Sequence, residues 1–136
     1  MKRIVVGAGL VRGAPQSPEE GRFLLSRRPN GTHLARWWEF PGGKVEPGEN
    51  PAESVRRELK EELDIMVSVG DIYAVGHHVY DEREVILLVY EAVHTGGLPT
   101  CLGVSEFAWL TAEEIVALEL PPADEPVVER LRREYM

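Results

Sequence analysis

Three glutamates lie within five consecutive positions of the sequence: Glu58, Glu61 and Glu62. Side chains three and four positions apart are neighbours on a helix, so a helix over residues 51–63 would bring these carboxylates onto one arc about 100° wide. Like charges at that spacing repel each other by roughly 0.2 to 0.5 kcal/mol per pair. A divalent cation with oxygen ligands would offset the repulsion. The alternative is a solvated helix surface rich in Glu and Lys, which is common in proteins.

The helix that must position these glutamates has a clear start signal. Asn50 is a preferred N-cap residue, Pro51 fits the first helical position, and Glu53 at the third position completes a capping box. Apolar residues at helical spacing predict the buried stripe of this helix: Ala52, Val55, Leu59 and Leu63. The stripe is centred about 110° around the helix from the carboxylates, so the acids lie beside the core and remain accessible.

The rest of the chain alternates between strand and helix patterns. Segments with strand propensity predict strands at residues 2–12, 23–26, 38–40, 66–80, 84–94 and 106–110. Gly42 and Gly43 allow a tight backbone bend that leaves carbonyls free to face a ligand. A short helix with its own capping box is predicted at residues 111–118, and a final helix from about residue 124. This mixture favours an α/β fold with a mixed sheet covered on both faces.

Length and composition limit the class of protein. At 136 residues the chain is expected to form one domain, residues 1–136, and its 43% hydrophobic content is typical of a soluble globular protein. The lone Cys101 cannot form an internal disulfide, which favours a cytoplasmic location. The apolar run at residues 4–11 is too short and too interrupted by glycine for a secretory signal, and no stretch reaches the length of a membrane span. Both a monomer and a homodimer remain open.

The charges are unevenly distributed. The net charge of −8 argues against binding a nucleic acid polymer, which relies on a basic face. Residues 22–44 nevertheless carry one acid, Glu39, against five basic residues: Arg22, Arg27, Arg28, Arg36 and Lys44. Residues 46–64 carry seven acids against three basic residues. A basic loop beside an acidic helix suits a polyphosphate held by cationic side chains at one end and by metal ions at the other, although such charges can also simply solvate opposite surfaces.

The register of residues 43–65 resembles the Nudix box, Gly-x5-Glu-x7-Arg-Glu-U-x-Glu-Glu-x-Gly-U, where U is a bulky aliphatic residue. Gly43, Glu49, Arg57 and the three glutamates occupy its positions. The one departure is Asp64, which stands where the box has Gly. That position follows the helix, where a left-handed backbone is common, and Asp is among the residues that tolerate this conformation. We therefore expect a small stability cost and an intact site.

The resemblance implies an α/β/α sandwich with the box as a loop-helix-loop, and attack of a metal-activated water on a phosphorus of a diphosphate bridge. Carried over residue by residue, it implies that Glu58 and Glu62 bind Mg²⁺ or Mn²⁺. Glu61 would be a further metal ligand, and the carbonyl of Gly42 or Gly43 would complete the set.

The remaining residues of the box are implied to have supporting roles in catalysis. Arg57 would pair with Glu49 and hold the start of the helix against the preceding loop. The general base would come from the glutamate cluster, with Glu58 the leading candidate, or from a distal acid such as Glu106. Glu106 could equally be an ordinary polar residue before a strand.

A second resemblance, to the MutT-like nucleoside triphosphate pyrophosphohydrolases, extends beyond the box. It rests on Arg27-Arg28, His33, and the segments at residues 38–44 and 120–127. This branch implies release of a nucleoside monophosphate and pyrophosphate, with 8-oxo-dGTP as its best-known substrate. The substrate contacts expected here are Arg28, His33, Glu39, Phe40, Lys44 and Asp124, of which Arg28 and Lys44 would bind phosphate. Trp37, Trp38 and Phe40 could form a stacking wall for the base.

The base preference is open because Asp124 stands where members specific for oxidised guanine commonly carry Asn. An ionised Asp only accepts hydrogen bonds. It could accept from the N1–H and N2–H₂ edge of guanine, or from the amine of cytosine, as in members that act on CTP and 5-methyl-dCTP. The alternative is that Asp124 caps the final helix. Hydrolysis of a nucleoside-diphosphate sugar and a non-enzymatic nucleotide-binding module on the same scaffold also remain open.

Overall fold

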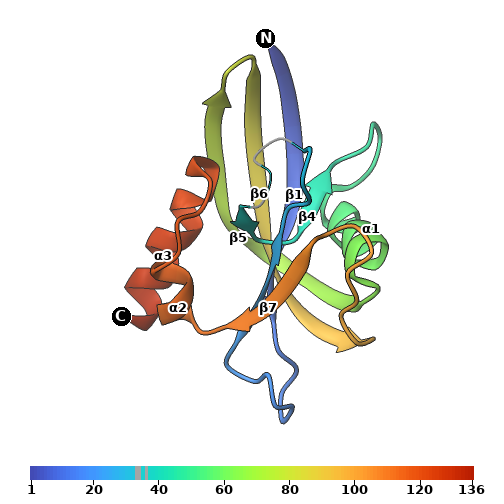
Figure 1. The fold of residues 1–136 in the computed structure, drawn as a ribbon, viewed down its shortest axis with the longest axis vertical. Helices are drawn as coiled ribbons and strands as arrows, with labels where there is room; N and C mark the ends of the chain where they lie inside the picture. Colours follow the sequence, from blue (N-terminus) through green and yellow to red (C-terminus); the bar gives the residue numbers. More distant parts are fainter. Residues whose placement is uncertain (33–34, 36) are drawn as a thin grey trace.

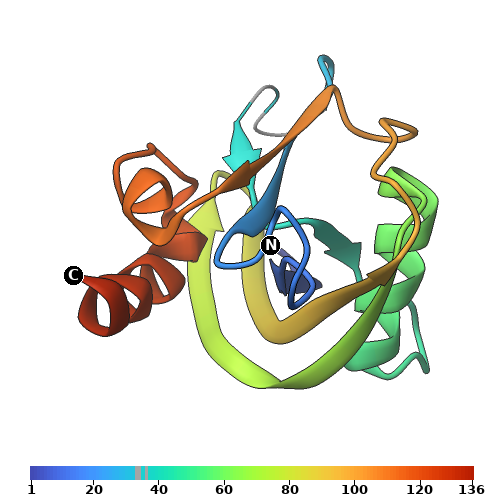
Figure 2. The same cartoon turned by 90° about the horizontal axis from the view of Figure 1, so that it is seen from below.

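The computed structural model describes residues 1–32, 35 and 37–136. Its elements in chain order are β1 (Lys2–Arg12), β2 (Phe23–Arg27), β3 (Trp38–Glu39), β4 (Gly42–Lys44), α1 (Pro51–Leu63), β5 (Met66–Tyr80), β6 (Arg83–Gly96), β7 (Glu106–Leu110), α2 (Ala112–Val116), the 3-10 turn η1 (Pro122–Asp124) and α3 (Glu125–Tyr135). Helix α1 lies on one side of a curled sheet, and α2 and α3 lie on the other (Figure 1, Figure 2). The predicted α/β/α arrangement is confirmed.

The strands form one mixed sheet in the order β3-β2-β1-β6-β5, with β4 paired to β1 and β7 paired to β2. Strands β1 and β6 are parallel along their whole length, from Lys2 opposite Arg83 to Arg12 opposite Val93, whereas the other pairs are antiparallel. Register shifts near residues 69–74 of β5 let the long β5 and β6 hairpin curl around the centre of the molecule (Figure 2). The parallel pair therefore places the start of β6 beside the start of β1.

Strand β4 was not predicted, because the sequence indicated only a bend at the two glycines. Gly42 lies opposite Ala8 of β1, and a Cβ at Gly42 would lie 2.1 Å from the carbonyl oxygen of Gly7. Any side chain there would collide with backbone, so the close approach of β4 to β1 requires glycine. This pairing carries Gly43 and Lys44 to the edge of α1.

The core has two parts, one on each face of the sheet. The part beneath α1 contains the helix residues Val55, Leu59 and Leu63, all fully buried, which confirms the predicted stripe except for the half-buried Ala52. The part beneath α2 and α3 includes Leu10, Leu25, Phe40, Ile115, Val127 and Leu131. No helix in the described part of the chain is long and apolar enough to cross a bilayer.

The ends of α1 agree with the sequence in most details. Asn50 caps the helix by accepting a hydrogen bond from the Ala52 N–H at 2.8 Å. The predicted capping box is wrong, because the Glu53 carboxylate pairs with Arg56 instead. Asp64 has the expected left-handed backbone, with φ 55° and ψ 39°. Asp64 therefore adopts the left-handed conformation expected at the position where the Nudix box, which this segment resembles, has Gly.

Helix α2 begins as predicted and ends early. The Thr111 hydroxyl accepts from the Glu114 N–H, and the Glu114 carboxylate accepts from the Thr111 N–H, which is the expected capping box. The helix ends at Val116 rather than at residue 118. A separate 3-10 turn then precedes α3.

Candidate active site

A cavity of about 370 Å³ opens where β1, β4, β6, α1 and η1 meet. One end is lined by polar residues from β4, α1 and the preceding strands: Arg28, Glu39, Gly42, Gly43, Lys44, Glu46, Glu58 and Glu62. The other end combines Tyr80, Arg83 and Asp124 with apolar walls that include Ile4, Val6, Phe40, Val85 and Leu87. The cavity therefore has one strongly charged end and one largely apolar end.

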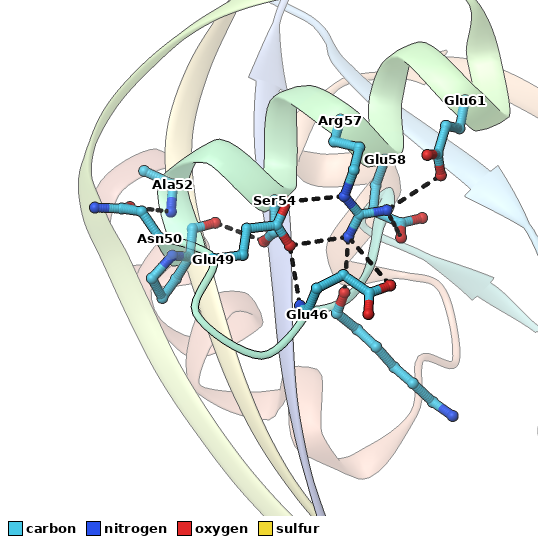
Figure 3. Close-up of polar contacts among 10 residues, drawn as sticks. Glu46, Glu49, Asn50, Ala52, Ser54, Arg57, Glu58 and Glu61 are labelled. Atoms are coloured by element: carbon cyan, nitrogen blue, oxygen red, sulfur yellow. Dashed lines mark hydrogen bonds and ion pairs between the residues drawn. The ribbon is translucent and has the colours of Figure 1, made fainter.

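The three glutamates of α1 do not have equivalent positions. The side chains of Glu58 and Glu62 line the cavity, and that of Glu58 is only 13% exposed. The side chain of Glu61 is 57% exposed and lies outside the described lining of the cavity. Glu61 still belongs to the cluster, because one Arg57 nitrogen donates to both Glu58 at 2.9 Å and Glu61 at 3.1 Å (Figure 3).

Arg57 joins the helix to the loop that precedes it. Its guanidinium donates to the two carboxylate oxygens of Glu49 at 2.8 and 3.0 Å, and to the Lys44 carbonyl at 3.0 Å. Figure 3 shows this guanidinium surrounded by glutamates from the loop and the helix. The hydrogen bond from Arg57 holds the pKa of Glu49 below its ordinary value. The implied ion pair between Arg57 and Glu49 is thus present, with two parallel hydrogen bonds.

At the charged end of the cavity, buried carboxylates lie close enough to repel one another. Burial, with the added charges of Glu58 and Glu39, raises the pKa of Glu62 to about 8, although Arg28 opposes the shift. Burial also raises the pKa of Glu58, against the opposing effect of Arg57. Carboxylates that are both desolvated and mutually repulsive favour a proton or a cation between them.

The donors at this end fit a hard divalent cation. Glu58 and Glu62 line the cavity beside Gly42 and Gly43 of β4, and carboxylate and carbonyl oxygens are the ligands that Mg²⁺ and Mn²⁺ prefer. A Cβ at Gly43 would lie 2.4 Å from the Glu58 carboxyl carbon, so glycine makes room for this carboxylate against the backbone. The described residues hold no preassembled group of three acidic, His or Cys ligands. Glu58 and Glu61 are turned toward Arg57 instead.

The expected phosphate contacts lie next to the acids. Arg28 and Lys44 line the cavity, and an Arg28 nitrogen lies 3.2 Å from both carboxylate oxygens of Glu39. Burial raises the pKa of Glu39, against the effect of Arg28. The basic segment and the acidic helix therefore meet in one cavity. His33 and Arg36 lie outside the described residues.

The predicted aromatic wall is only partly correct. Phe40 is buried in the core and also lines the cavity. Trp37 and Trp38 are absent from the described lining, and the Arg27 guanidinium lies over the Trp38 ring at 5.6 Å. Trp38 is in β3, paired to Arg27 of β2, so the sheet register turns it toward that neighbour.

Glu106 does not support the alternative of a distal base. Its carboxylate forms an ion pair with Arg27 at 2.5 Å, and it lies outside the described lining of the cavity. Strand β7 pairs with β2 at this point, so Glu106 lies directly opposite Arg27. The geometry thus assigns it to an exposed cross-strand ion pair.

Asp124 lines the cavity and does not cap α3. Its backbone is helical, with φ −81° and ψ −7°, and its side chain makes no capping hydrogen bond. The residue is 5% exposed, and its buried Oδ2 has no hydrogen-bond partner. Burial raises the pKa of Asp124 well above its ordinary value, and the charge of Glu39 adds to the shift. A buried polar atom without a protein partner is normally satisfied by an ordered water or by a ligand in the cavity.

Among the cavity residues that sequence reasoning did not single out are Tyr80, the last residue of the predicted strand 66–80, and Arg83, which directly precedes the predicted strand 84–94. They face each other across the β5 and β6 hairpin. The strand alternation offered a signal, since Arg83 shares its face of β6 with Val85 and Leu87. The parallel pairing of β6 with β1, which brings this face beside Ile4, could not be read from a local pattern.

Known proteins resemble this chain along almost its whole length. The profile of the NUDIX domain matches residues 8–131. The 8-oxo-dGTP diphosphatase of Escherichia coli K12 is 30% identical over 98% of this chain and 99% of its own length. The CTP pyrophosphohydrolase of the same organism is 33% identical over 95% of this chain and 91% of its own length.

The solved structures give the same result. The crystal structure of the MutT protein from Methanosarcina mazei Go1 superimposes with a TM-score of 0.83 and 32% identity, covering 98% of this chain and 95% of that chain. The match extends well beyond the acidic helix, over both faces of the sheet. The chain therefore belongs to the Nudix hydrolase family, in its MutT-like branch.

Proposed function

We propose that this enzyme hydrolyses a nucleoside triphosphate to the monophosphate and pyrophosphate, with 8-oxo-dGTP as the leading candidate substrate. The observation that carries the proposal is the two-ended cavity. Its charged end gathers Glu58 and Glu62 with Arg28 and Lys44, and its apolar end has the buried carboxyl of Asp124, whose Oδ2 has no protein partner. A nucleotide offers the matching pattern of a polyphosphate at one end and a polar-edged base at the other.

A divalent cation would be held by Glu58, Glu62 and the carbonyl of Gly42 or Gly43, with Glu61 as a further ligand. Once bound, such a cation supplies the charge that neutralises the polyphosphate and activates the attacking water. Release of Glu61 and Glu58 from Arg57 would free oxygens for this role, because both now accept from the same guanidinium nitrogen.

The protein's own groups would complete the reaction. Glu58 would accept the proton of the attacking water, and burial raises its pKa, which increases its proton affinity. Arg28 and Lys44 would bind phosphate oxygens, and Glu39 would orient Arg28. Arg57, tied to Glu49, would keep the loop and the helix in fixed relation during turnover.

The base assignment rests on the protonation state of Asp124. Burial favours the neutral form of this carboxyl, and a neutral carboxyl has one O–H donor and remaining acceptor capacity. It can therefore offer the donor and acceptor pair that Asn offers in members specific for oxidised guanine. An ionised Asp124 would only accept hydrogen bonds, either from the N1–H and N2–H₂ edge of guanine or from the cytosine amine. The cytosine contact is the basis of the alternative, a CTP or 5-methyl-dCTP pyrophosphohydrolase.

We further propose that residues 1–136 act as one cytoplasmic domain on a small-molecule nucleotide, as a monomer or homodimer. The net charge of −8 weighs against a nucleic acid polymer or an anionic membrane surface as partner. The single cysteine, Cys101, is free and exposed, as suits a reducing compartment.

Pyrophosphate release tests the proposal. The protein would be incubated with Mg²⁺ or Mn²⁺ and, separately, 8-oxo-dGTP, dGTP, CTP, 5-methyl-dCTP and ADP-ribose. We expect metal-dependent release of pyrophosphate and the monophosphate, fastest with 8-oxo-dGTP. Faster turnover of the cytosine nucleotides would select the alternative base. ADP-ribose would release AMP and ribose 5-phosphate in place of pyrophosphate, so it would be followed by the AMP formed, and its faster turnover would select a nucleoside-diphosphate-sugar hydrolase. No turnover of any nucleotide by folded, metal-loaded protein would leave a binding module.

A further inference from the structure

The turn that carries Asp124 is seated directly on strand β5. A Cβ at Gly76 would lie 1.8 Å from the carbonyl oxygen of Ala123, so the turn approaches the strand at a point where no side chain fits. Four residues further along β5, the Tyr80 hydroxyl accepts a hydrogen bond from the Ala123 N–H at 2.9 Å. Gly76 thus leaves space for the carbonyl oxygen of Ala123, and Tyr80 accepts a hydrogen bond from its N–H. Ala123 itself is 4% exposed.

The carboxyl of Asp124 has little else to hold it in place. Its side chain makes no capping bond, and its Oδ2 is buried without a partner. Its backbone N–H donates to the Pro121 carbonyl at 2.9 Å, within the same turn. The position of the carboxyl in the cavity therefore follows from where the turn sits on β5.

We propose that Gly76 and Tyr80 are positioning residues for base recognition: they dock η1 on β5 and so set where Asp124 meets the base. The inference rests on the proposed role of Asp124 as a base contact. Gly76 acts by leaving space, and Tyr80 acts through its hydroxyl. Base selectivity is thereby determined partly on a strand that the Nudix box does not include.

Substitutions at Gly76 and Tyr80 would disturb the docking of η1 in different ways. A methyl group at Gly76 meets backbone, which cannot rotate away as a flexible side chain can, so the turn must shift. Loss of the Tyr80 hydroxyl leaves the Ala123 N–H without its partner but keeps the aromatic ring on the cavity wall. A displacement of about 1 Å at a recognition group is enough to change its interaction with substrate by one to two orders of magnitude.

The test measures the dissociation constants of dGMP and dCMP by calorimetry, so that it does not depend on turnover. The base preference is the ratio of the larger to the smaller dissociation constant. Gly76→Ala should reduce this ratio by about tenfold, and Tyr80→Phe should reduce it by about threefold. Two substitutions on the same strand are matched controls. Gly70→Ala adds a Cβ at an ordinary 3.6 Å from the Glu91 carbonyl, and Tyr73→Phe removes a hydroxyl that donates to Glu134 on α3. Both controls should leave the ratio within about twofold of the parent.

The possible results separate the inference from the proposed function. The positioning role would be overturned if Gly76→Ala and Tyr80→Phe kept the ratio of the parent. It would also be overturned if the two control variants shifted the ratio equally, or if the parent had no preference between the nucleotides. Circular dichroism would show whether Gly76→Ala folds. If it does not fold, the ratio measured for Tyr80→Phe decides whether the positioning role holds. A parent that binds with base preference but releases no pyrophosphate would remove the proposed reaction and leave the positioning role in place.

Discussion

The carboxylate of Glu58 occupies the space that a side chain on Gly43 would need, since a Cβ there would lie 2.4 Å from the Glu58 carboxyl carbon. Gly43, the first glycine of the Nudix box, and Glu58 are therefore a matched pair. One comes from β4 and the other from α1, and the pairing of β4 with β1 sets the distance between them. The glycine matters here for the room it leaves beside the carboxylate.

This relationship predicts the effect of Gly43→Ala. The added methyl group would push Glu58 away from β4, so kcat should fall by about 10²-fold while the melting temperature changes little. Steady-state kinetics with Mg²⁺ and thermal melting would measure the two effects. Gly70→Ala, where the added Cβ makes only ordinary contacts, is the control. Parent-like kcat in Gly43→Ala would mean that the two residues need not fit together.

Glu58→Gln tests the assignment of the metal helix. The substitution keeps the shape of the side chain and removes the charge that would bind the cation and accept the proton, so kcat should fall by several orders of magnitude, to about 10⁻³ of the parent or lower. The fold should persist, as circular dichroism would show. Glu53→Gln, on the exposed face of the same helix, should retain parent activity. Near-normal turnover in Glu58→Gln would place the metal elsewhere.

Arg57→Lys tests the joint between loop and helix. Lysine keeps the positive charge but cannot make the two parallel bonds to Glu49 together with those to Glu58 and the Lys44 carbonyl. We expect kcat to fall by about tenfold and the melting temperature by about 3 °C. Arg56→Lys is the control, because Arg56 lies one residue earlier and forms an ion pair with the exposed Glu53. This substitution should change neither quantity. Equal losses in both variants would argue for a general effect of arginine on the helix.

Asp124→Asn should change how stability depends on pH. Because burial raises the pKa of Asp124 above its unfolded value, the folded state binds its proton more tightly, and the parent loses stability as pH rises from about 4 through that raised pKa. Asn has no such proton. The variant should therefore be more stable than the parent near neutral pH and lose that advantage below about pH 4. Parallel stability curves for the two proteins, measured by urea unfolding across pH, would contradict a buried titrating carboxyl.

The same substitution should change base preference. Asn presents a fixed donor and acceptor, whereas the Asp124 carboxyl presents whichever pattern its protonation allows. We expect Asp124→Asn to alter the ratio of kcat/KM for guanine over cytosine nucleotides, with Glu125→Gln, the exposed next residue, as control. An unaltered ratio would remove Asp124 from base recognition.

Local signals in the sequence determined the acidic helix almost completely. Its bounds, its Asn50 cap, its buried stripe and the left-handed Asp64 depend on residues within a few positions of one another, where backbone preference and helical spacing act directly. Glu53 is the exception within this segment, because a nearby arginine competes with the helix terminus for its carboxylate. Most strands were also visible, since alternation marks a half-buried strand without reference to its partners.

Only the tertiary structure decided which distant residues share the cavity. The parallel pairing of β1 with β6 brings Arg83 beside Lys2 and Val85 beside Ile4. The docking of η1 on Gly76 turns Asp124 from a plausible cap into a buried wall residue. The register of β3 with β2 turned Trp38 toward Arg27 and away from the predicted stacking role. Strand pairing joins residues far apart in the chain and depends on packing over the whole sheet, so no local pattern encodes it.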